Sequence, residues 1–410
     1  MPLKKIKAIH LIGGVVVIGS ASLLFSQSSS IFVTRYNSVA SPEISEAAGE
    51  APKPEAVKHI KTPKPLKAIY MTSWVAGTRD LRANMVKLIE ETELNSLVID
   101  VKDYTGRIAF EVSEPLLKAI GSEEIRIPDL KDFLKDLHDK EIYTIGRITV
   151  FQDPYLAKTR PDLAVKRASD GGVWKDYKGL SFTDPGSKEV WDYHVTLAKE
   201  AYAIGFDELN FDYIRFPSDG PMSDIAFPWS GNRAKADVLE DFFAYLQNGM
   251  KGTGARLSAD VFGITTTNTD DLNIGQVLEK TAPYFDFISP MVYPSHYPPH
   301  FIGLSNPAAE PYKVVNYSIS EAVKRLIATT TPVKAKGSIL ISTTTTPLLY
   351  SKKVFDINKL RPWLQDFDLG AIYTPEMVQA QMRAVYDSGL DSWMLWDAAN
   401  TYTRGALLPQ

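Results

Sequence analysis

Hydrophobic and polar residues alternate along residues 207–217, and this segment sets the pattern for the rest of the chain. Its alternate apolar positions are Leu209, Phe211 and Tyr213. Asn210 and Asp212 lie between them, so a strand here buries one apolar face and holds an amide and a carboxylate on the other. Polar groups on the inner face near the end of a strand predict a functional site.

Strand and helix signals alternate from residue 67 onward. The predicted strands, in chain order, are 68–74, 96–103, 142–151, 207–217, 256–262, 285–293, 360–367 and 392–397. The predicted helices are 80–93, 130–140, 187–204, 232–250, 274–284, 318–329 and 375–388. This alternation predicts an α/β fold, a (β/α)8 barrel whose ligands gather at the carboxyl ends of the strands. Residues 338–350 predict a hairpin inserted before the seventh strand.

The N-terminus has a different pattern. The lysines at positions 4, 5 and 7 precede an apolar run at 8–25, which is typical of a signal peptide or a membrane anchor. The run is near the lower limit of roughly 17–25 residues for a spanning helix, and no clear Ala-x-Ala cleavage site follows it. We expect residues 1–25 to form an uncleaved transmembrane anchor with its lysine end in the cytoplasm. A cleaved signal peptide and a secreted protein are the alternative.

The next segment separates this anchor from the barrel. Residues 26–65 are rich in Ser, Ala, Glu, Lys and Pro, a composition that predicts a flexible, disordered linker. Residues 66–410 then form the barrel domain. Because the lysines that precede residues 8–25 are expected in the cytoplasm, the barrel is expected outside the cytoplasmic membrane. A single pass through residues 8–25 would attach it.

Composition narrows the chemistry. The formal net charge is −4 with no basic excess, so we expect no nucleic-acid partner. The chain has no cysteine, which excludes disulfides, thiolate metal sites and a cysteine nucleophile. It has no glycine-rich phosphate loop. His296 and His300 follow the sixth strand without a carboxylate partner at metal-binding spacing, so we expect no cofactor and no catalytic metal.

Four motifs carry a resemblance to a known family. They are Asn210-x-Asp212, its continuation Tyr213–Pro217, the sixth-strand Met291–Tyr293 and the eighth-strand Trp393–Asp397. With these motifs the chain resembles, over about residues 67–402, bacterial glycoside hydrolases long catalogued as a domain of unknown function. The resemblance implies a TIM-type barrel and a glycosidase.

The same places are more distantly similar to chitinase-type barrels, whose fourth strand reads Asp-x-x-Asp-x-Asp-x-Glu. That pattern falls here on Asp207, Asn210, Asp212 and Ile214. The glutamate that donates the proton in chitinases is replaced by Ile214, which has no proton to give. Chitinase chemistry by that route is therefore not expected.

Glycoside hydrolysis usually requires two carboxyl groups, one protonated and one ionised. We expect Asp212 to be the nucleophile or charge stabiliser, kept ionised by Asn210 and Arg215, and Asp260 to be the acid, because its apolar neighbours raise a carboxyl pKa. Asp212 could instead serve as a cap or in a salt bridge to Arg147 or Arg215, and Asp260 as a buried hydrogen-bonding group. Asp100 of the second strand is a competitor for either role, as is Asp103.

Other candidates would hold the sugar. The residues expected to bind substrate are Trp74, Asp100, Arg147, Asn210, Arg215, Tyr293 and Trp396. Tryptophan faces bury the apolar side of a pyranose, so Trp74 and Trp396 are expected to form a stacking floor. Arg147 and Arg215 would orient acidic sugars or hold Asp212 ionised.

Two classes of function remain open at this point. The resemblance implies a glycoside hydrolase that acts on a cell-envelope or extracellular polysaccharide by a two-carboxylate mechanism. The alternative is a non-catalytic glycan-binding barrel tethered to the membrane, which the absence of a glutamate at position 214 favours. The sequence does not indicate an oligomeric state.

Overall fold

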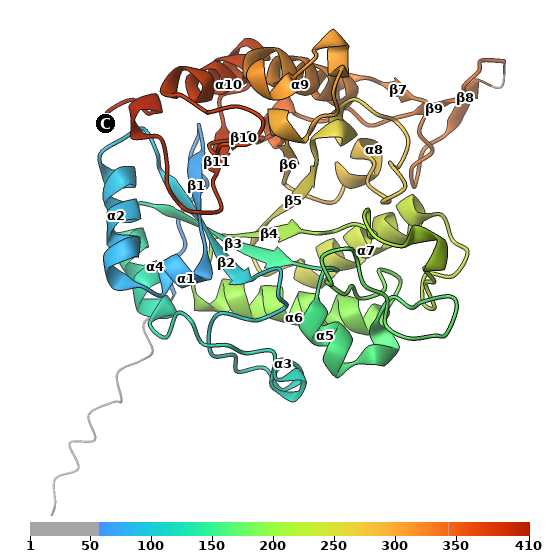
Figure 1. Cartoon of the computed structure of the whole chain (residues 1–410), viewed down its shortest axis with the longest axis horizontal. Coiled ribbons are helices and arrows are strands. Elements are labelled where there is room, and N and C mark those ends of the chain that lie inside the picture. Colours follow the sequence, from blue (N-terminus) through green and yellow to red (C-terminus); the bar gives the residue numbers. More distant parts are fainter. Residues whose placement is uncertain (1–56, 343) are drawn as a thin grey trace, which may run out of the picture. The chain divides into compact units, whose positions relative to one another are not determined.

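The computed structural model describes residues 57–342 and 344–410, and its centre is a closed barrel of parallel strands (Figure 1). The strands are β1 (Lys67–Met71), β2 (Ser96–Lys102), β3 (Tyr143–Thr149), β4 (Glu208–Asp212), β5 (Arg256–Phe262), β6 (Phe287–Met291), β10 (Trp363–Gln365) and β11 (Trp393–Trp396). Each pairs in parallel with the next, and β11 pairs with β1 to close the ring. The predicted eight-stranded α/β barrel is confirmed.

Helices surround the barrel. The longer ones are α2 (Arg79–Glu90), α4 (Leu130–Asp139), α6 (Lys188–Ile204), α7 (Lys235–Met250), α9 (Pro311–Ile327) and α10 (Pro375–Asp387). The shorter ones are α1 (Ser73–Ala76), α3 (Pro115–Ile120), α5 (Pro154–Thr159) and α8 (Leu278–Thr281). Six of the seven predicted helices have a long counterpart here, although α9 begins at Pro311, in the first helical turn where proline is tolerated, rather than at 318.

The helix predicted at 274–284 is largely wrong. Only α8, four residues long, forms there. Asn273 and Gly275 have positive φ angles of 56° and 87°, which interrupt a right-handed helix at its expected start. Pro283 lies just beyond α8, where a proline disfavours continuation of the helix.

Two apolar layers explain why β4 presents polar groups to the interior. Leu209 and Phe211 are fully buried in the layer between strands and helices, where Phe211 packs against Phe285. Burying side chains of this kind contributes about 1.5–3 kcal/mol each. A second apolar cluster fills the barrel itself and includes Tyr70, Val98, Ile145, Trp363 and Met394. Glu208, Asn210 and Asp212 are the residues of β4 whose side chains point into the barrel. The alternation in the sequence predicted this for Asn210 and Asp212.

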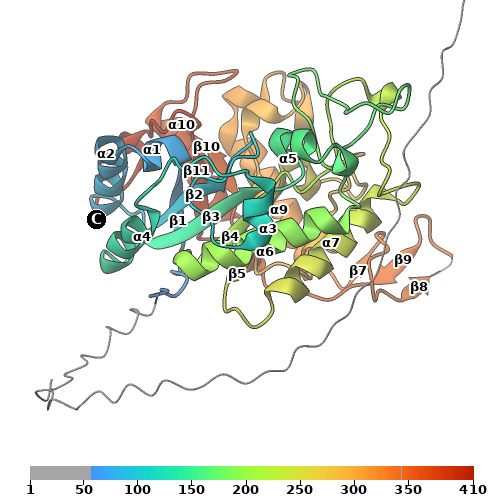
Figure 2. The same cartoon turned by 90° about the horizontal axis from the view of Figure 1, so that it is seen from below.

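A small antiparallel sheet is inserted between α9 and β10. Its strands are β7 (Thr330–Thr331), β8 (Leu340–Ser342) and β9 (Leu349–Ser351), in the order β7-β9-β8. The inserted hairpin predicted at 338–350 is therefore confirmed, with β7 as a third strand. Figures 1 and 2 both show this sheet at the periphery, away from the barrel strands.

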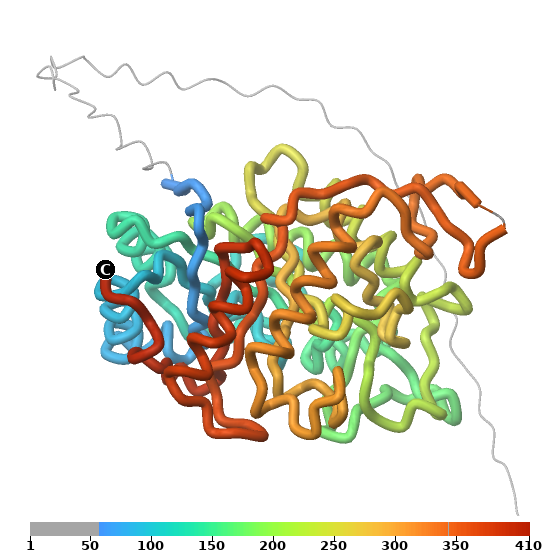
Figure 3. The backbone as a smooth tube through the Cα atoms, turned by 90° about the horizontal axis from the view of Figure 1, so that it is seen from above, coloured from blue at the N-terminus to red at the C-terminus, as the bar shows by residue number. Residues whose placement is uncertain are grey.

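The last residues of the chain lie beside the segment that follows α2, in the cyan part of the chain (Figure 3). Pro409 forms a bridge with Thr92, ahead of β2. Residues 57–65, the end of the predicted linker, lie at the lower end of the barrel, where the strands begin. There the backbone N–H of Ile60 donates to Asp207 at 2.8 Å.

The predicted anchor at 1–25 and the linker as far as 56 lie outside the described residues. Within residues 57–342 and 344–410, no helix has the length and apolar character needed to cross a bilayer.

Candidate active site

Two carboxyl groups lie side by side at the upper end of the barrel, where the strands end. The register pairs Asn210 with Ser258 and Phe211 with Ala259. Asp212 and Asp260 are therefore one step farther along neighbouring strands, which run about 4.8 Å apart. Both side chains face the barrel interior and are buried, with 5% and 1% of their surface exposed.

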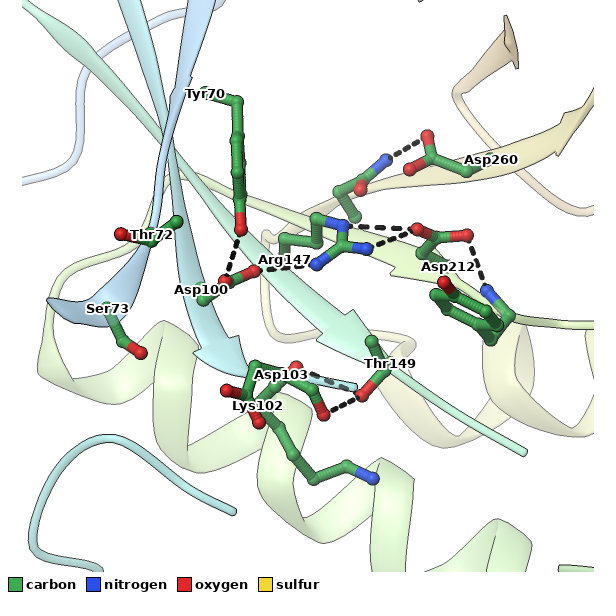
Figure 4. A network of polar contacts seen from close by, with 12 residues as sticks. Tyr70, Thr72, Ser73, Asp100, Lys102, Asp103, Arg147, Thr149, Asp212 and Asp260 are labelled. Carbon is green, nitrogen blue, oxygen red and sulfur yellow. Dashed lines mark hydrogen bonds and ion pairs between the residues drawn. The ribbon is translucent and has the colours of Figure 1, made fainter. Parts of the chain in front are cut away.

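Asp212 is paired with Arg147 of β3 (Figure 4). Arg147 donates to Asp212 Oδ2 from Nε at 3.1 Å and from Nη2 at 2.5 Å. Its remaining Nη1 donates to Asp100 Oδ1 at 2.7 Å. Tyr70 donates to the other oxygen of Asp100 at 2.5 Å. Arg147 is thus fixed between two carboxylates and presents one of its edges to Asp212.

Of the predicted partners of Asp212, Arg147 is confirmed, whereas a direct bond from Asn210 or Arg215 is not. Arg215 makes no ion pair with Asp212 within the described part of the chain, and its Nη1 donates to neutral groups instead. Asn210 donates to Asp260 rather than to Asp212. The other bond to Asp212 comes from the backbone N–H of Tyr213, at 2.6 Å from Oδ1.

Asp260 lies in a different environment. Its Oδ1 accepts hydrogen bonds from Asn210 Nδ2 at 2.8 Å and from Trp363 Nε1 at 2.9 Å. Among the described residues, Oδ2 has no hydrogen-bond partner. Burial, and then the charge of Asp212, raise the pKa of Asp260 to about 8. The predicted direction of this shift is confirmed, and a raised pKa favours the protonated form of the Asp260 carboxyl.

A cavity of about 550 Å³ opens over the two carboxyl groups. Its lining includes six predicted site residues, which are Arg147, Asp212, Arg215, Asp260, Tyr293 and Trp396. His296 also lines it. Asp100 and Asn210 are buried beside the lining residues and act through them, since they bond to Arg147 and Asp260.

Aromatic side chains form part of the cavity wall. Trp396 stacks on Tyr70, with ring centres 4.0 Å apart and planes 15° from parallel. The edge of Trp363 packs against it at 5.4 Å. Tyr293 is buried between His296 and Phe367, and burial raises its pKa well above the ordinary value, so its hydroxyl keeps its proton.

The structure does not bring Trp74 to this cavity. The strand predicted at 68–74 ends at Met71, because Thr72 caps α1 by accepting a hydrogen bond from the backbone N–H of Val75. Trp74 therefore lies on α1, where 62% of its surface is exposed and Arg126 lies over its ring at 4.4 Å.

The competitors from β2 are also separated from the cavity. A register irregularity between Asp100 and Lys102 changes the facing of the strand end. Lys102 forms a buried ion pair with Asp153 at 2.6 Å. Asp103 is paired with Arg126 at 2.5 Å. Asp100 of β2 and Asp103, which follows it, thus both have their carboxylates engaged by other described residues.

Trp363 and Tyr70 were not predicted as site residues, although both contact the predicted ones. The sequence could have indicated them by their positions, because Trp363 lies on the inner face of the predicted seventh strand and Tyr70 on that of the first. Within the described ranges, no three residues of metal-binding type cluster together.

Several solved structures resemble this chain, and the first described here shares its fold. The glycoside hydrolase domain of PgaB (BpsB) from Bordetella bronchiseptica is 12% identical, over 82% of this chain and 94% of that one, with a TM-score of 0.57. A hypothetical protein from Ruminiclostridium thermocellum is 37% identical over 47% of this chain and 97% of its own, with a TM-score of 0.44. A chitinase from Chromobacterium violaceum is 11% identical, over 83% and 96%, with a TM-score of 0.46.

At 12% identity, the likeness to the PgaB domain shows the barrel fold alone. No match was found among curated proteins. The decisive comparison is with a family model, described as "Putative glycosyl hydrolase domain", which matches residues 68–402. That range contains the cavity and nearly all of the barrel. The chain therefore belongs to this glycosyl hydrolase family, and its class of enzyme is glycosidase, as the resemblance implied.

Proposed function

We propose that the barrel hydrolyses glycosidic bonds of a cell-envelope or extracellular polysaccharide by a two-carboxylate mechanism. One observation carries the proposal. At a single cavity, Asp212 is paired with a guanidinium, while the neighbouring Asp260 is buried with a pKa raised to about 8. Such a separation of protonation states is what assigns the acid and the base in a glycosidase.

The roles follow from the contacts. Asp260 is protonated at neutral pH and has one oxygen without a partner among the described residues, so it donates its proton to the leaving glycosidic oxygen. The Asp212 carboxylate faces the anomeric carbon and stabilises the positive charge that develops there. Arg147 holds that carboxylate in place, and Trp396 supports the apolar face of the sugar.

A glycan-binding barrel without catalysis is the second candidate. The observation that favours it is Ile214, which is fully buried at the place where chitinase-type barrels keep their proton donor. The presence of Asp260 as a protonated carboxyl on the next strand weighs against this candidate.

The two functions are separated by digestion of a glycan library with the wild-type chain and with Asp212→Asn. The hydrolase predicts released sugar from at least one glycan with the wild type and a loss of release with the variant. A binding module predicts retention of a glycan with no release by either chain.

We also propose that the barrel acts outside the cytoplasmic membrane and remains attached to it. The support is the basic-then-apolar sequence of residues 4–25. Protease added to intact spheroplasts should then digest the barrel. Protection of the barrel, in cells where a periplasmic control is digested, would show the opposite orientation.

A further inference from the structure

Arg215 lies at the rim of the cavity, just beyond the end of β4. Its Cζ atom is 4.9 Å from the centre of the Phe262 ring and 5.1 Å from that of Tyr213. Nη1 donates to the backbone oxygen of Phe216 at 3.2 Å and to Ser218 Oγ at 3.1 Å. Neutral groups thus fix the orientation of this guanidinium.

One edge of the Arg215 guanidinium makes no hydrogen bond to the residues that the structure describes. Its hydrogen bonds to described residues all come from Nη1, so Nε–H and Nη2–H remain available. These two groups donate in parallel, which is the arrangement that binds a carboxylate in a bidentate manner. Burial lowers the pKa of Arg215, because the charged form loses hydration there. A bound anion would offset this cost.

Arg147, the other arginine of the cavity, has no such edge. Nε and Nη2 donate to Asp212, and Nη1 donates to Asp100. The sequence had left two roles open for both arginines, holding Asp212 and orienting an acidic sugar. The contacts give the first role to Arg147 and leave the second to Arg215.

Lys178 reaches the same rim from the loop that precedes α6. Its ammonium group forms no salt bridge with a carboxylate of the described residues. Together with Tyr213 and Arg215, it lines both the active-site cavity and an adjoining hollow of about 360 Å³. After burial, its charge is the second cause that lowers the pKa of His296, a cavity residue. Two cations that form no salt bridge with other described residues therefore stand where the cavity and the hollow meet.

The hollow also contains two aspartates, Asp176 and Asp219. Oδ1 of Asp176 already accepts hydrogen bonds from the backbone N–H groups of Lys178 and Leu180, at 2.9 Å and 2.8 Å. The charges of Asp176 and Asp219 also raise the pKa of Arg215, but less than those of Tyr213 and Asp212 do.

We propose that Arg215 and Lys178 bind a carboxylate carried by a sugar unit of the substrate, so that the glycan this enzyme cleaves is acidic. Arg215 would donate two parallel hydrogen bonds, and Lys178 would add a point charge. The inference rests on the proposed function, because it places the acidic sugar in the same cavity as Asp212 and Asp260.

The test measures binding with matched probes. The probes are oligosaccharides of glucuronic, galacturonic and mannuronic acid, each beside its carboxyl-reduced counterpart. The protein is the full chain carrying Asp260→Asn, which removes the proposed acid but keeps the neutral charge of its protonated form. Calorimetric titrations compare this chain with chains that also carry Arg215→Gln, Lys178→Gln or, as a control, Lys175→Gln. Lys175 is an exposed lysine of the same loop that lines neither hollow.

The expected result is tighter binding of at least one acidic probe than of its reduced counterpart, by about 10–100-fold, as for hydrogen bonds to charged groups. Arg215→Gln and Lys178→Gln should each remove most of this difference without changing affinity for the reduced probe. Lys175→Gln should change neither affinity.

Three outcomes would overturn the proposal: equal affinity for acidic and reduced probes, equal loss of both in Arg215→Gln, or no binding of any acidic probe. The proposed function can fail separately. Selective acidic binding by a wild-type chain that hydrolyses nothing would remove the hydrolase and keep the acidic site. Hydrolysis of neutral glycans with no preference for acidic ones would keep the hydrolase and remove the acidic site.

Discussion

Strand β4 carries a buried carboxylate paired with an arginine near each of its ends. At the lower end, Glu208 pairs with Arg361 and accepts a hydrogen bond from Tyr143 at 3.1 Å. At the upper end, Asp212 pairs with Arg147. A hollow lies at each end as well, of about 720 Å³ below and 550 Å³ above. Neither the ion pair nor the hollow therefore distinguishes the two ends.

What distinguishes them is which groups reach the hollow. Glu208 is fully buried and does not line the lower hollow, whereas Asp212 lines the upper cavity. Asp207, which does line the lower hollow, accepts bonds from Ile60 and from His138 on its two oxygens. The upper cavity instead has Asp260, a protonated carboxyl, beside the paired one. Under the proposed function, the upper ion pair is the catalytic one because substrate can reach it and a proton donor lies next to it.

The largest expected effect separates the two ends by activity. Asp212→Asn should lower kcat by about 10⁴-fold, as for removal of a catalytic carboxylate, while the chain stays folded because Arg147 keeps its bond to Asp100. Glu208→Gln is the matched control, since it removes a charge from the same strand. Its kcat should stay near the wild-type value in the folded fraction. Wild-type activity in Asp212→Asn would end the hydrolase account.

The second effect separates the two carboxyl groups of the upper end. Asp260→Asn should lower turnover by about 10²–10⁴-fold, as for loss of a general acid. A substrate with a nitrophenol leaving group needs little protonation, so it should restore much of the activity of Asp260→Asn but not that of Asp212→Asn. Equal restoration in both variants, measured as release of nitrophenol, would reverse or cancel the assigned roles.

The third effect concerns stability at the lower end. Glu208→Gln leaves Arg361 buried without its counter-charge and should lower the free energy of unfolding by about 3–5 kcal/mol. Urea denaturation measures this loss. Replacing both partners, as Glu208→Leu with Arg361→Met, should recover much of it. A loss of less than about 1 kcal/mol in Glu208→Gln, the range of an exposed pair, would show that the lower pair does not stabilise the fold as a buried ion pair.

The smallest effect is a change in pH dependence. Asp260 must be protonated to act, so kcat/KM should be kept below pH about 8 and lost as pH rises through its raised pKa. Trp363 donates to Asp260 Oδ1, a bond that favours the ionised form. Trp363→Phe should therefore move the alkaline limb of the pH profile of kcat/KM to higher pH, by about one pH unit or less. A downward shift would contradict the assigned donor.

Much of the fold could be predicted because local patterns decide it. The alternation that places Asn210 and Asp212 on the inner face of β4 is visible within five residues. The end of β1 was mistaken because Trp74 continues the apolar pattern. Thr72, a residue type that favours helix caps, was the signal that a helix begins there.

Apart from the pair of Arg147 with Asp212, the contacts of the site could not be predicted, because a sequence does not give the register between strands. Asn210 and Asp212 are adjacent inward positions on one strand, yet Asn210 bonds to β5 and Asp212 bonds to β3. Arg215 is near Asp212 in sequence, but the chain turns at Tyr213, whose φ is 51°, and carries Arg215 away. Trp363 reaches Asp260 across 103 positions of sequence.

The central claim is that Asp260 is protonated at neutral pH because it is buried beside the charge of Asp212. The most direct test is a ¹³C NMR titration of the aspartate carboxyl groups in the full chain, with Asp260→Asn used to assign the Asp260 signal. The account predicts that Asp260 titrates near pH 8 in the wild type and at lower pH in Asp212→Asn, where the neighbouring charge is gone. Titration of Asp260 near the ordinary aspartate value of about 3.9 in the wild type would contradict it.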